Sequence, residues 1–216
     1  QIGVVQGVQG MRWYEGRLTG RAAHTGSTPM MMRSNALLGA ARLIDYVDAL
    51  AHDYAPSAVG TIGFIEVTPN STNVIPGEVH FTVDLRHPDD RILDAMEEKL
   101  FSFFRAQTEK IGLEGQLEPI SKTDAVAFHP DCIQAVRDAS EKHGFSTLDI
   151  ISGAGHDAVH TASIVPTTMI FVPSEGGLSH NEAEATSSAE CTAGAQVLLD
   201  AVLIYDRLIA ERKNAA

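Results

Sequence analysis

The stretch Glu78-Val79-His80-Phe81-Thr82-Val83-Asp84-Leu85-Arg86 decides the fold of the first half of this chain. Its apolar residues alternate strictly with polar ones, which is the pattern of a β-strand with one face on a core and the other toward water. The next residues, His87-Pro88-Asp89-Asp90, interrupt the strand and offer an N-cap for a helix. The stretch therefore predicts a half-buried strand that leads directly into a helix.

The elements around this strand extend the pattern in both directions. The sequence predicts strands over 11–18, 58–67 and 112–120 and a helix over 35–51. A second helix follows the quoted strand, with a buried stripe formed by Ile92, Leu93, Met96, Leu100, Phe103 and Phe104. The resulting order βαββαβ predicts a ferredoxin-like sandwich, in which two helices cover one face of an antiparallel sheet.

The pattern changes after a connector over 121–127. The sequence predicts a helix over 130–143, strands over 148–151 and 167–172, and a last helix that begins with the capping box Ser187-x-x-Glu190 and reaches about Ala210. Strands that alternate with helices indicate an α/β layer with parallel strands. Two strands are too few for a stable sheet of this kind, so we expect this layer to be incomplete. The fold class is therefore α/β overall, with an α+β first part.

Composition and charge limit the classes of function. The chain has 216 residues, with 16 basic and 28 acidic side chains and a formal net charge of −12. This balance argues against a nucleic-acid partner, because binding to phosphates depends on Lys and Arg. No apolar run approaches the roughly 20 residues of a membrane helix, so no membrane partner is expected. Two distant cysteines, Cys132 and Cys191, fit a reducing, cytoplasmic location. The strand-like start at Gln1 suggests a segment of a longer polypeptide, or equally a processed chain.

Two loops that follow predicted strands could carry chemistry. In the loop Ser152–Asp157, Gly153 and Gly155 permit positive φ, and the next helix would direct free N–H groups at an anion. A tight strand-to-helix turn explains the same residues. In the loop 176–184, His180 is placed to bind a metal through a neutral imidazole, but such a site needs two or three further ligands. A solvated surface histidine is the plain alternative.

Three polar residues of the first half lie near the ends of its predicted elements. His24 lies between the first strand and the first helix, Asn73 precedes a turn, and Arg86 ends the alternating strand. Together, an imidazole, an amide and a guanidinium would suit a substrate with a carbonyl and a carboxylate. Three unrelated surface residues remain the alternative. No G-x-S-x-G motif is present, so nucleophilic catalysis by a serine is not expected.

Five motifs together resemble the amidase/hydantoinase/carbamoylase branch of the M20 metallopeptidase superfamily. Its members include N-carbamoyl-L-amino acid hydrolases, β-ureidopropionases and allantoate amidohydrolases. The resemblance runs from about Ile2 to Leu208, and its motifs, in family order, are Ala22–Met30, Asn73–Gly77, Asp84–Pro88, Ser152–Asp157 and Gly177–Glu184.

The resemblance implies a division into domains and an assembly. Residues 9–123 would form a lid, or dimerisation, domain, which pairs two copies into a homodimer. Residues 1–8 would end one segment of a catalytic domain, and residues 124–216 would form its carboxyl-terminal part. The upstream half, with the remaining metal ligands and the catalytic glutamate, would be absent. We therefore expect this segment alone to be inactive.

The resemblance also implies roles for single residues. His180 would be one ligand of a centre with two divalent metal ions (Zn, Mn, Co or Ni). His24, Asn73 and Arg86 would bind substrate and complete the neighbouring subunit's site, with His24 stabilising an oxyanion and Arg86 holding a carboxylate. The backbone of Gly155 would also contact that carboxylate.

The reaction implied is hydrolysis of the carbamoyl C–N bond of an N-carbamoyl amino acid, which yields the amino acid, CO2 and ammonia. Allantoate amidohydrolase, or an M20 aminoacylase or dipeptidase, is the enzymatic alternative. A dimerisation or binding module without catalysis is the alternative of another class. A non-catalytic module does not require a set of polar residues such as His24, Asn73, Arg86 and His180, so their presence argues against that alternative.

Overall fold

The computed structural model describes residues 1–215 and divides the chain into two compact units. The first is Gln9–Ala125, which we call the sandwich unit. The second combines Gln1–Val8 with the chain from Val126 onward, and we call it the terminal unit.

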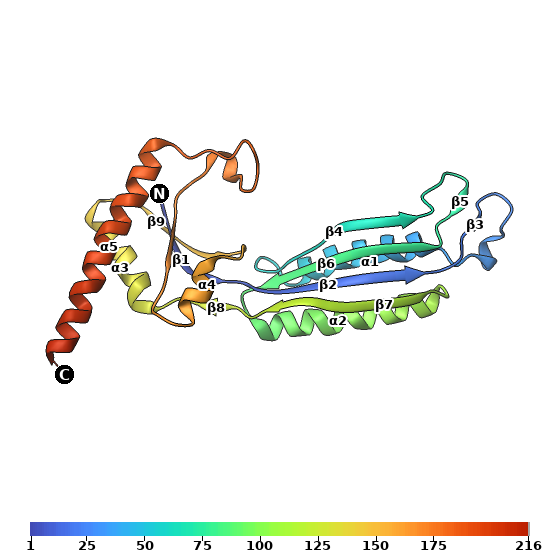
Figure 1. Cartoon of the computed structure of the whole chain (residues 1–216), viewed down its shortest axis with the longest axis horizontal. Coiled ribbons are helices and arrows are strands. Elements are labelled where there is room, and N and C mark those ends of the chain that lie inside the picture. The colour runs from blue at the N-terminus through green and yellow to red at the C-terminus, as the bar shows by residue number, and fades with distance from the viewer. Residues whose placement is uncertain (216) are drawn as a thin grey trace. The chain divides into compact units, whose positions relative to one another are not determined.

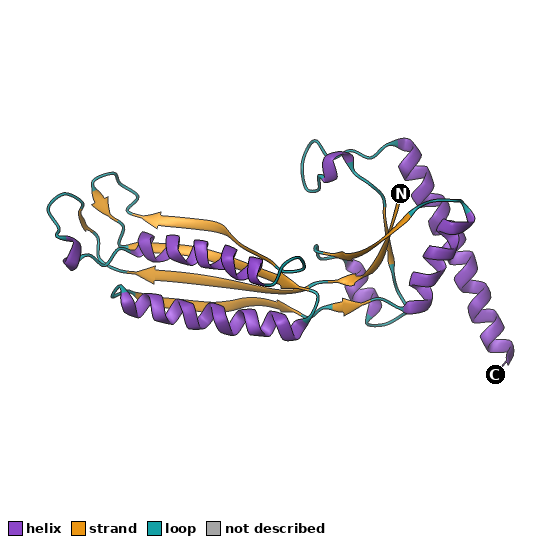
Figure 2. Cartoon of the chain, turned by 180° about the vertical axis from the view of Figure 1, so that it is seen from behind, coloured by secondary structure: helices purple, strands orange, loops and turns teal. Residues whose placement is uncertain are grey.

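The sandwich unit is a four-stranded antiparallel sheet with two helices on one face (Figures 1 and 2). The strand order is β4-β6-β2-β7. This confirms the predicted βαββαβ sandwich. Its elements are β2 (Gly10–Thr19), α1 (Ala36–Asp53), β4 (Val59–Thr68), β6 (Glu78–His87), α2 (Asp90–Lys110) and β7 (Glu114–Thr123). Between them lie the short strands β3 (Ala23–His24) and β5 (Val74–Ile75), which pair with each other, and a 3-10 turn, η1 (Met30–Met32).

The alternation in β6 sorts its side chains between the core and water. Every second residue from Val79 to Leu85 is buried, whereas Asp84 and Arg86 on the other face are half-buried. The buried face packs against apolar residues of both helices and of β2, among them Tyr14, Leu18, Leu43, Leu50, Met96 and Leu100. Helix α2 begins as predicted, because the Asp89 carboxylate accepts a hydrogen bond from the backbone N–H of Arg91 at 2.9 Å.

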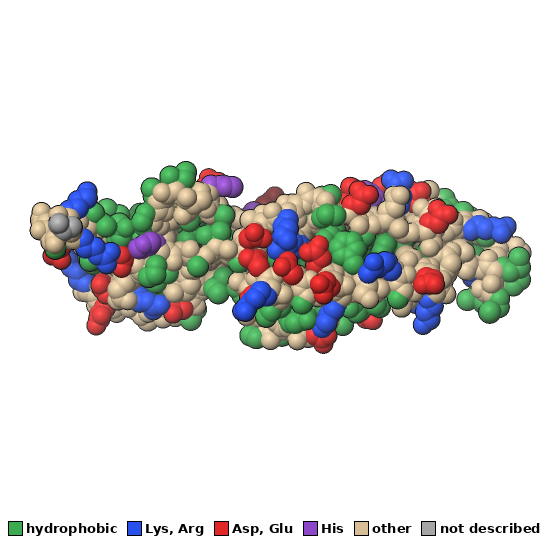
Figure 3. All heavy atoms as spheres, turned by 90° about the horizontal axis from the view of Figure 1, so that it is seen from below, with side chains coloured by type: hydrophobic (Ala, Val, Ile, Leu, Met, Phe, Trp, Pro, Cys, Tyr) green, Lys and Arg blue, Asp and Glu red, His purple; other side chains and the backbone are tan. Residues whose placement is uncertain are grey.

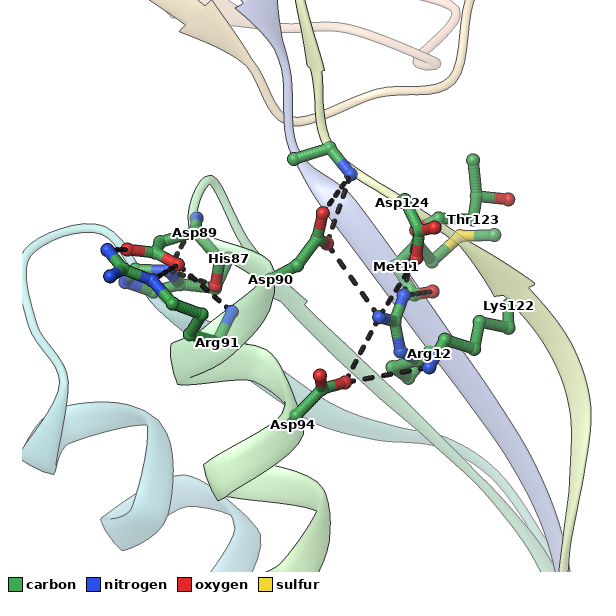
Figure 4. A network of polar contacts seen from close by, with 11 residues as sticks. Met11, Arg12, His87, Asp89, Asp90, Arg91, Asp94, Lys122, Thr123 and Asp124 are labelled. Carbon is green, nitrogen blue, oxygen red and sulfur yellow. Dashed lines mark hydrogen bonds and ion pairs between the residues drawn. The ribbon is translucent and has the colours of Figure 1, made fainter.

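One charged residue is buried in this unit. Arg12 shares the inward face of β2 with Tyr14, and only 2% of its surface is exposed. Its Nη2 lies 3.1 Å from Asp124 and 3.3 Å from Asp94, and its Nη1 donates to the carbonyl of Thr123 at 2.9 Å (Figure 4). This network ties the first residues of β2 to the last residues of β7 and to the first turns of α2.

The terminal unit is built around β1 (Ile2–Val8). This strand pairs in parallel with β9 (Thr147–Ser152) and antiparallel with β10 (Met169–Phe171) and β8 (Val126–Ala127). The expectation of a parallel layer is therefore right for β9 and wrong for β10. The order of strands and helices does not encode pairing direction here, because the common partner β1 comes from the other end of the sequence.

The helices of the terminal unit are α3 (Pro130–Lys142), α4 (Asp157–Ala162) and α5 (Ser188–Ala215), with a 3-10 turn, η2 (Glu175–Gly177). Ile2 and Val4 pack against buried residues of α3 and α5. Ser187 caps α5 as predicted, because its hydroxyl accepts from the Glu190 N–H at 3.2 Å and donates to the Glu190 carboxylate at 2.9 Å. Within residues 1–215, no helix has the length and apolar character that a membrane span requires.

Candidate functional site

His24 lies at the tip of the sandwich unit, on the two-stranded ribbon of β3 and β5. Its side chain is exposed, and its Nδ1 accepts hydrogen bonds from the N–H groups of Gly26 at 3.0 Å and Ser27 at 3.2 Å. An Nδ1 that accepts twice carries no proton, so a neutral ring has its proton on Nε2. The tip therefore presents an N–H donor of fixed tautomer toward water.

Asn73 lies beside His24 on the same ribbon. The backbone N–H of Thr25 donates to the carbonyl of Asn73 at 3.0 Å, and the strand pairing joins His24 to the next residue, Val74. The Ser71 hydroxyl donates to the side-chain oxygen of Asn73 at 3.0 Å, which assigns the NH2 group as the donor available to a ligand. The ribbon thus brings two predicted site residues together, and both can donate to an oxyanion.

Arg33 supports this loop, although the sequence analysis did not select it. Its Nη2 donates to the carbonyl of Thr25 at 2.6 Å and its Nε to that of Thr28 at 2.9 Å. The guanidinium therefore ties both ends of the turn that holds the His24 ring. A lone arginine close after a Gly- and Ser-containing loop is the only signal for this role in the sequence.

Arg86 lies on β6 with its side chain on the sheet face away from the helices. Its Nη2 is 2.7 Å from Oδ2 of Asp84, and its Nε is 3.0 Å from Oδ1. The hydrogen bond to Asp84 raises the pKa of Arg86 above its ordinary value. The sequence placed both residues on one strand face but did not show that they pair.

The structure separates Arg86 from the other two sandwich residues. The ribbon of β3 and β5, which carries His24, lies beyond the end of the sheet at which β6 begins, whereas Arg86 lies one residue before the other end of β6, His87 (Figure 1). The eight steps from Glu78 to Arg86 span roughly 26 Å at about 3.3 Å per residue. A small substrate cannot bridge this distance, so one copy of the sandwich unit does not gather all three residues.

The loop after β9 is organised by a serine. The Ser152 hydroxyl is buried, lies 2.8 Å from Nε2 of His156 and accepts from the N–H of Ala154 at 3.2 Å. Gly155 is exposed, and a side chain there would meet nothing within 4 Å. Gly153 and Gly155 can adopt positive φ, but neither is among the positive-φ glycines of the described chain.

Helix α4, which follows this loop, has six residues. Its aligned peptide dipoles are correspondingly few, so the helix dipole makes only a small contribution to anion binding. Any contact of Gly155 with a carboxylate would therefore depend on its own backbone N–H.

His180 lies on an exposed loop between η2 and α5. Its φ of 55° is in the left-handed region, which a residue with a side chain occupies at a cost of about 1–2 kcal/mol. The Glu184 carboxylate accepts from its backbone N–H at 3.0 Å and holds this conformation. Strain kept at an exposed imidazole is a reason to consider function.

Among residues 1–215, no group of three or more His, Cys, Asp or Glu side chains could hold a metal ion. His180 by itself therefore does not make a metal centre, and the chain does not fit a metal without ligands from outside these residues.

The terminal unit also carries an apolar groove of about 1030 Å³. It is lined by β10, α3, α5 and residues 165–168, and both cysteines lie in its wall. Several apolar side chains of α5 are largely exposed, namely Leu198, Leu199, Val202 and Leu203. Exposed apolar side chains beside an apolar groove are typical of a surface that binds a partner or a ligand.

The surface of the sandwich unit differs in character. On the face that carries α2, acidic and basic side chains are interspersed (Figure 3). A shallow hollow there is lined by Asp94, Glu97, Glu98, Phe101, Arg105 and Lys122. This face therefore offers mixed charge and not the basic area that a phosphate backbone selects.

Comparison with known proteins gives consistent matches. The model of peptidase family M20/M25/M40 matches residues 15–204. The chain is 49% identical over 203 residues to an N-carbamoyl-L-amino-acid amidohydrolase of Rhizobium meliloti, covering 94% of this chain and 49% of that protein. It is 32% identical over 204 residues to an allantoate amidohydrolase of Escherichia coli K12, again covering 94% and 49%.

A solved structure agrees with these matches. The crystal structure of an amidase of the hydantoinase/carbamoylase family from Burkholderia multivorans superposes with a TM-score of 0.90 at 51% sequence identity. The match covers 93% of this chain and 49% of that one. The chain thus spans about half the length of the relatives it matches.

Proposed function

Because this chain belongs to peptidase family M20/M25/M40, we propose that it forms the substrate-binding half of an amidohydrolase that acts on N-carbamoyl amino acids. The family match confirms the resemblance that the five sequence motifs indicated. Support for the substrate comes from the relatives, one of which is named an N-carbamoyl-L-amino-acid amidohydrolase at 49% identity. The proposed reaction cleaves the carbamoyl C–N bond and releases the amino acid, CO2 and ammonia.

The observation that carries this proposal is the donor pair at the tip. In hydrolysis of a carbamoyl group, negative charge develops on the carbonyl oxygen in the transition state. We assign the Nε2–H of His24 and the side-chain NH2 of Asn73 to that oxygen. Support comes from the two amides that fix the His24 tautomer and from the ribbon that holds Asn73 beside it. Donors oriented before reaction are effective because they need no reorganisation.

Arg86 is assigned to the carboxylate of the substrate. A guanidinium can bind a carboxylate through two parallel N–H bonds, which fixes direction as well as charge. The backbone N–H of Gly155 is proposed as a contact of the substrate carboxylate. The open space around Gly155 is consistent with close approach of a ligand.

Arg86 and His24 act on one substrate only if they come from different copies of the chain. Their separation of roughly 26 Å along β6 supports this arrangement. We therefore propose a homodimer through the sandwich unit, in which the tip of one copy completes the site that holds Arg86 of the other. This refines the expectation that all three residues of one lid serve the neighbouring site.

The proposed enzyme also needs parts outside residues 1–215. His180 is assigned as one ligand of a centre with two divalent ions (Zn, Mn, Co or Ni), which would activate water and polarise the scissile carbonyl. The other ligands and a general base would come from the remaining half of a family-length polypeptide. We propose that the same half covers the apolar groove of the terminal unit. The chain by itself is expected to be inactive.

Steady-state hydrolysis of N-carbamoyl and N-acetyl amino acids tests the proposal in a polypeptide of the relatives' full length that contains this chain. We expect turnover of the carbamoyl compounds. Arg86→Ala should raise KM by about 10- to 100-fold, and His24→Ala should lower kcat by about 100-fold. Preference for the acetyl compounds would indicate an aminoacylase, and an unchanged KM in Arg86→Ala would refute the carboxylate assignment.

The second candidate is allantoate hydrolysis, which the 32% identity to an allantoate amidohydrolase supports. Ureido groups and a carboxylate are common to both substrates, so the assigned residues serve either. Direct competition between allantoate and an N-carbamoyl amino acid distinguishes them through the ratio of kcat/KM.

A further inference from the structure

Asp84 holds Arg86 in a defined orientation. Oδ1 accepts from Nε at 3.0 Å, and Oδ2 accepts from Nε at 3.1 Å and from Nη2 at 2.7 Å. The carboxylate therefore engages the Nε/Nη2 edge of the guanidinium. Both side chains are partly shielded from water, with 31% of Asp84 and 22% of Arg86 exposed.

The surroundings of this pair leave Asp84 committed to Arg86. Asp84 faces Trp13 on β2 and Thr61 on β4, and neither carries a charge. Other polar pairs on the same sheet face connect β2 with β6, such as the hydrogen-bonded pair of His80 and Glu15 at 2.7 Å. Those pairs join two strands and support the sheet, whereas Asp84 and Arg86 lie two residues apart on one strand. Their contact therefore adds nothing to strand pairing and acts on the direction of the arginine.

We propose that Asp84 is a positioning residue that fixes the guanidinium plane of Arg86 for binding of the substrate carboxylate. This inference rests on the proposed function, in which Arg86 binds that carboxylate. An arginine side chain is long and flexible, and a preset orientation lowers the entropy lost on binding. Asp84 also has an opposing effect, because its negative charge weakens attraction to an anionic substrate.

The two effects predict opposite results when Asp84 is replaced. If orientation dominates, KM rises. If charge dominates, KM falls, because the net charge around Arg86 becomes more positive. The contacts favour orientation, since three hydrogen-bond distances between 2.7 and 3.1 Å fix both the plane and the edge.

The test measures kcat and KM of the full-length enzyme with Asp84→Ala, Asp84→Asn and the control Glu15→Gln. The control also removes one negative charge from this sheet face but leaves Arg86 untouched. We expect Asp84→Ala to raise KM about tenfold and to leave kcat within about twofold of wild type, because the guanidinium is no longer oriented before the substrate binds. Asp84→Asn keeps one acceptor oxygen and should give a smaller rise, and Glu15→Gln should leave KM unchanged.

A double-mutant cycle separates positioning from a structural role. In an Arg86→Ala background, Asp84→Ala should add no further rise in KM, because there is no guanidinium left to orient. An equal rise in both backgrounds would overturn the inference, as would a KM that falls or stays unchanged in Asp84→Ala alone. If Arg86→Ala itself leaves KM unchanged, the proposed function fails first, so the two failures are distinguishable.

Discussion

Replacing Arg12 with methionine should destabilise the sandwich unit by about 3 kcal/mol, because two backbone carbonyls each lose a hydrogen bond from a charged donor, worth about 1.5 kcal/mol. The substitution keeps the apolar stem but removes the donors to the carbonyls of Met11 and Thr123 at 3.1 and 2.9 Å. It also leaves the carboxylates of Asp90, Asp94 and Asp124 without their shared cation. These carboxylates are 35–69% exposed and can be rehydrated, so their loss of a partner adds little to the cost.

Urea unfolding followed by the fluorescence of Trp13 measures this loss within the correct unit. Trp13 is the single tryptophan of the chain and lies next to Arg12 on β2. The matched control is Asp124→Asn, which removes one exposed partner and should cost no more than about 1 kcal/mol.

Replacing Arg12 should cost more stability than replacing one of its carboxylate partners, because Arg12 is buried and the carboxylates are exposed. A cost below about 1 kcal/mol for Arg12→Met would refute it, because a buried charge network would then contribute no more than a surface pair. An equal cost for Asp124→Asn and Arg12→Met would refute it as well.

Three further predictions concern other parts of the chain. Hydrogen bonds from His143, and then from Lys142 and Gln196, lower the pKa of Asp200 well below its usual range. The ionised carboxylate therefore stabilises the terminal unit above about pH 4, and this stabilisation is lost as the pH falls through the lowered pKa. The urea midpoint of the terminal unit should fall on acidification in wild type and fall less in Asp200→Asn. Gly155→Ala should leave thermal stability unchanged, because a Cβ meets nothing within 4 Å, while raising KM in the full-length enzyme. Gly16→Ala should cost about 1–3 kcal/mol by overpacking, because its Cβ would lie 2.2 Å from the Phe81 ring, and calorimetry checks the lowered Tm.

Local patterns predicted those parts of the fold that local physics decides. The alternation of β6 determined which residues enter the core, and Asp89 marked the start of α2. The direction of β10 could not be predicted, because it depends on pairing with β1, which lies far away in sequence. Burial of Arg12 could be predicted, because it shares a strand face with Tyr14. Its partners could not be predicted, because they come from α2 and from the end of β7.

The candidate site was predicted as a set of residues and not as a geometry. The motifs identified His24, Asn73 and Arg86, but only the length of β6 shows that they lie at opposite ends of one unit. The spacing of two placed Asp84 and Arg86 on one strand face, but their pairing required the folded chain. The contacts of Arg33 with the His24 loop are not encoded in any local period and required the folded chain.

Mixing of two impaired variants, assayed at substrate concentrations well below KM, tests the central claim most directly. Full-length His24→Ala and Arg86→Ala enzymes are dissociated, combined in equal amounts and reassociated before hydrolysis is measured. If each site takes His24 and Arg86 from different copies, one of the two sites in every mixed dimer is intact, and activity should recover to about one quarter of wild type. Activity that stays at the level of the two separate variants would contradict a shared site.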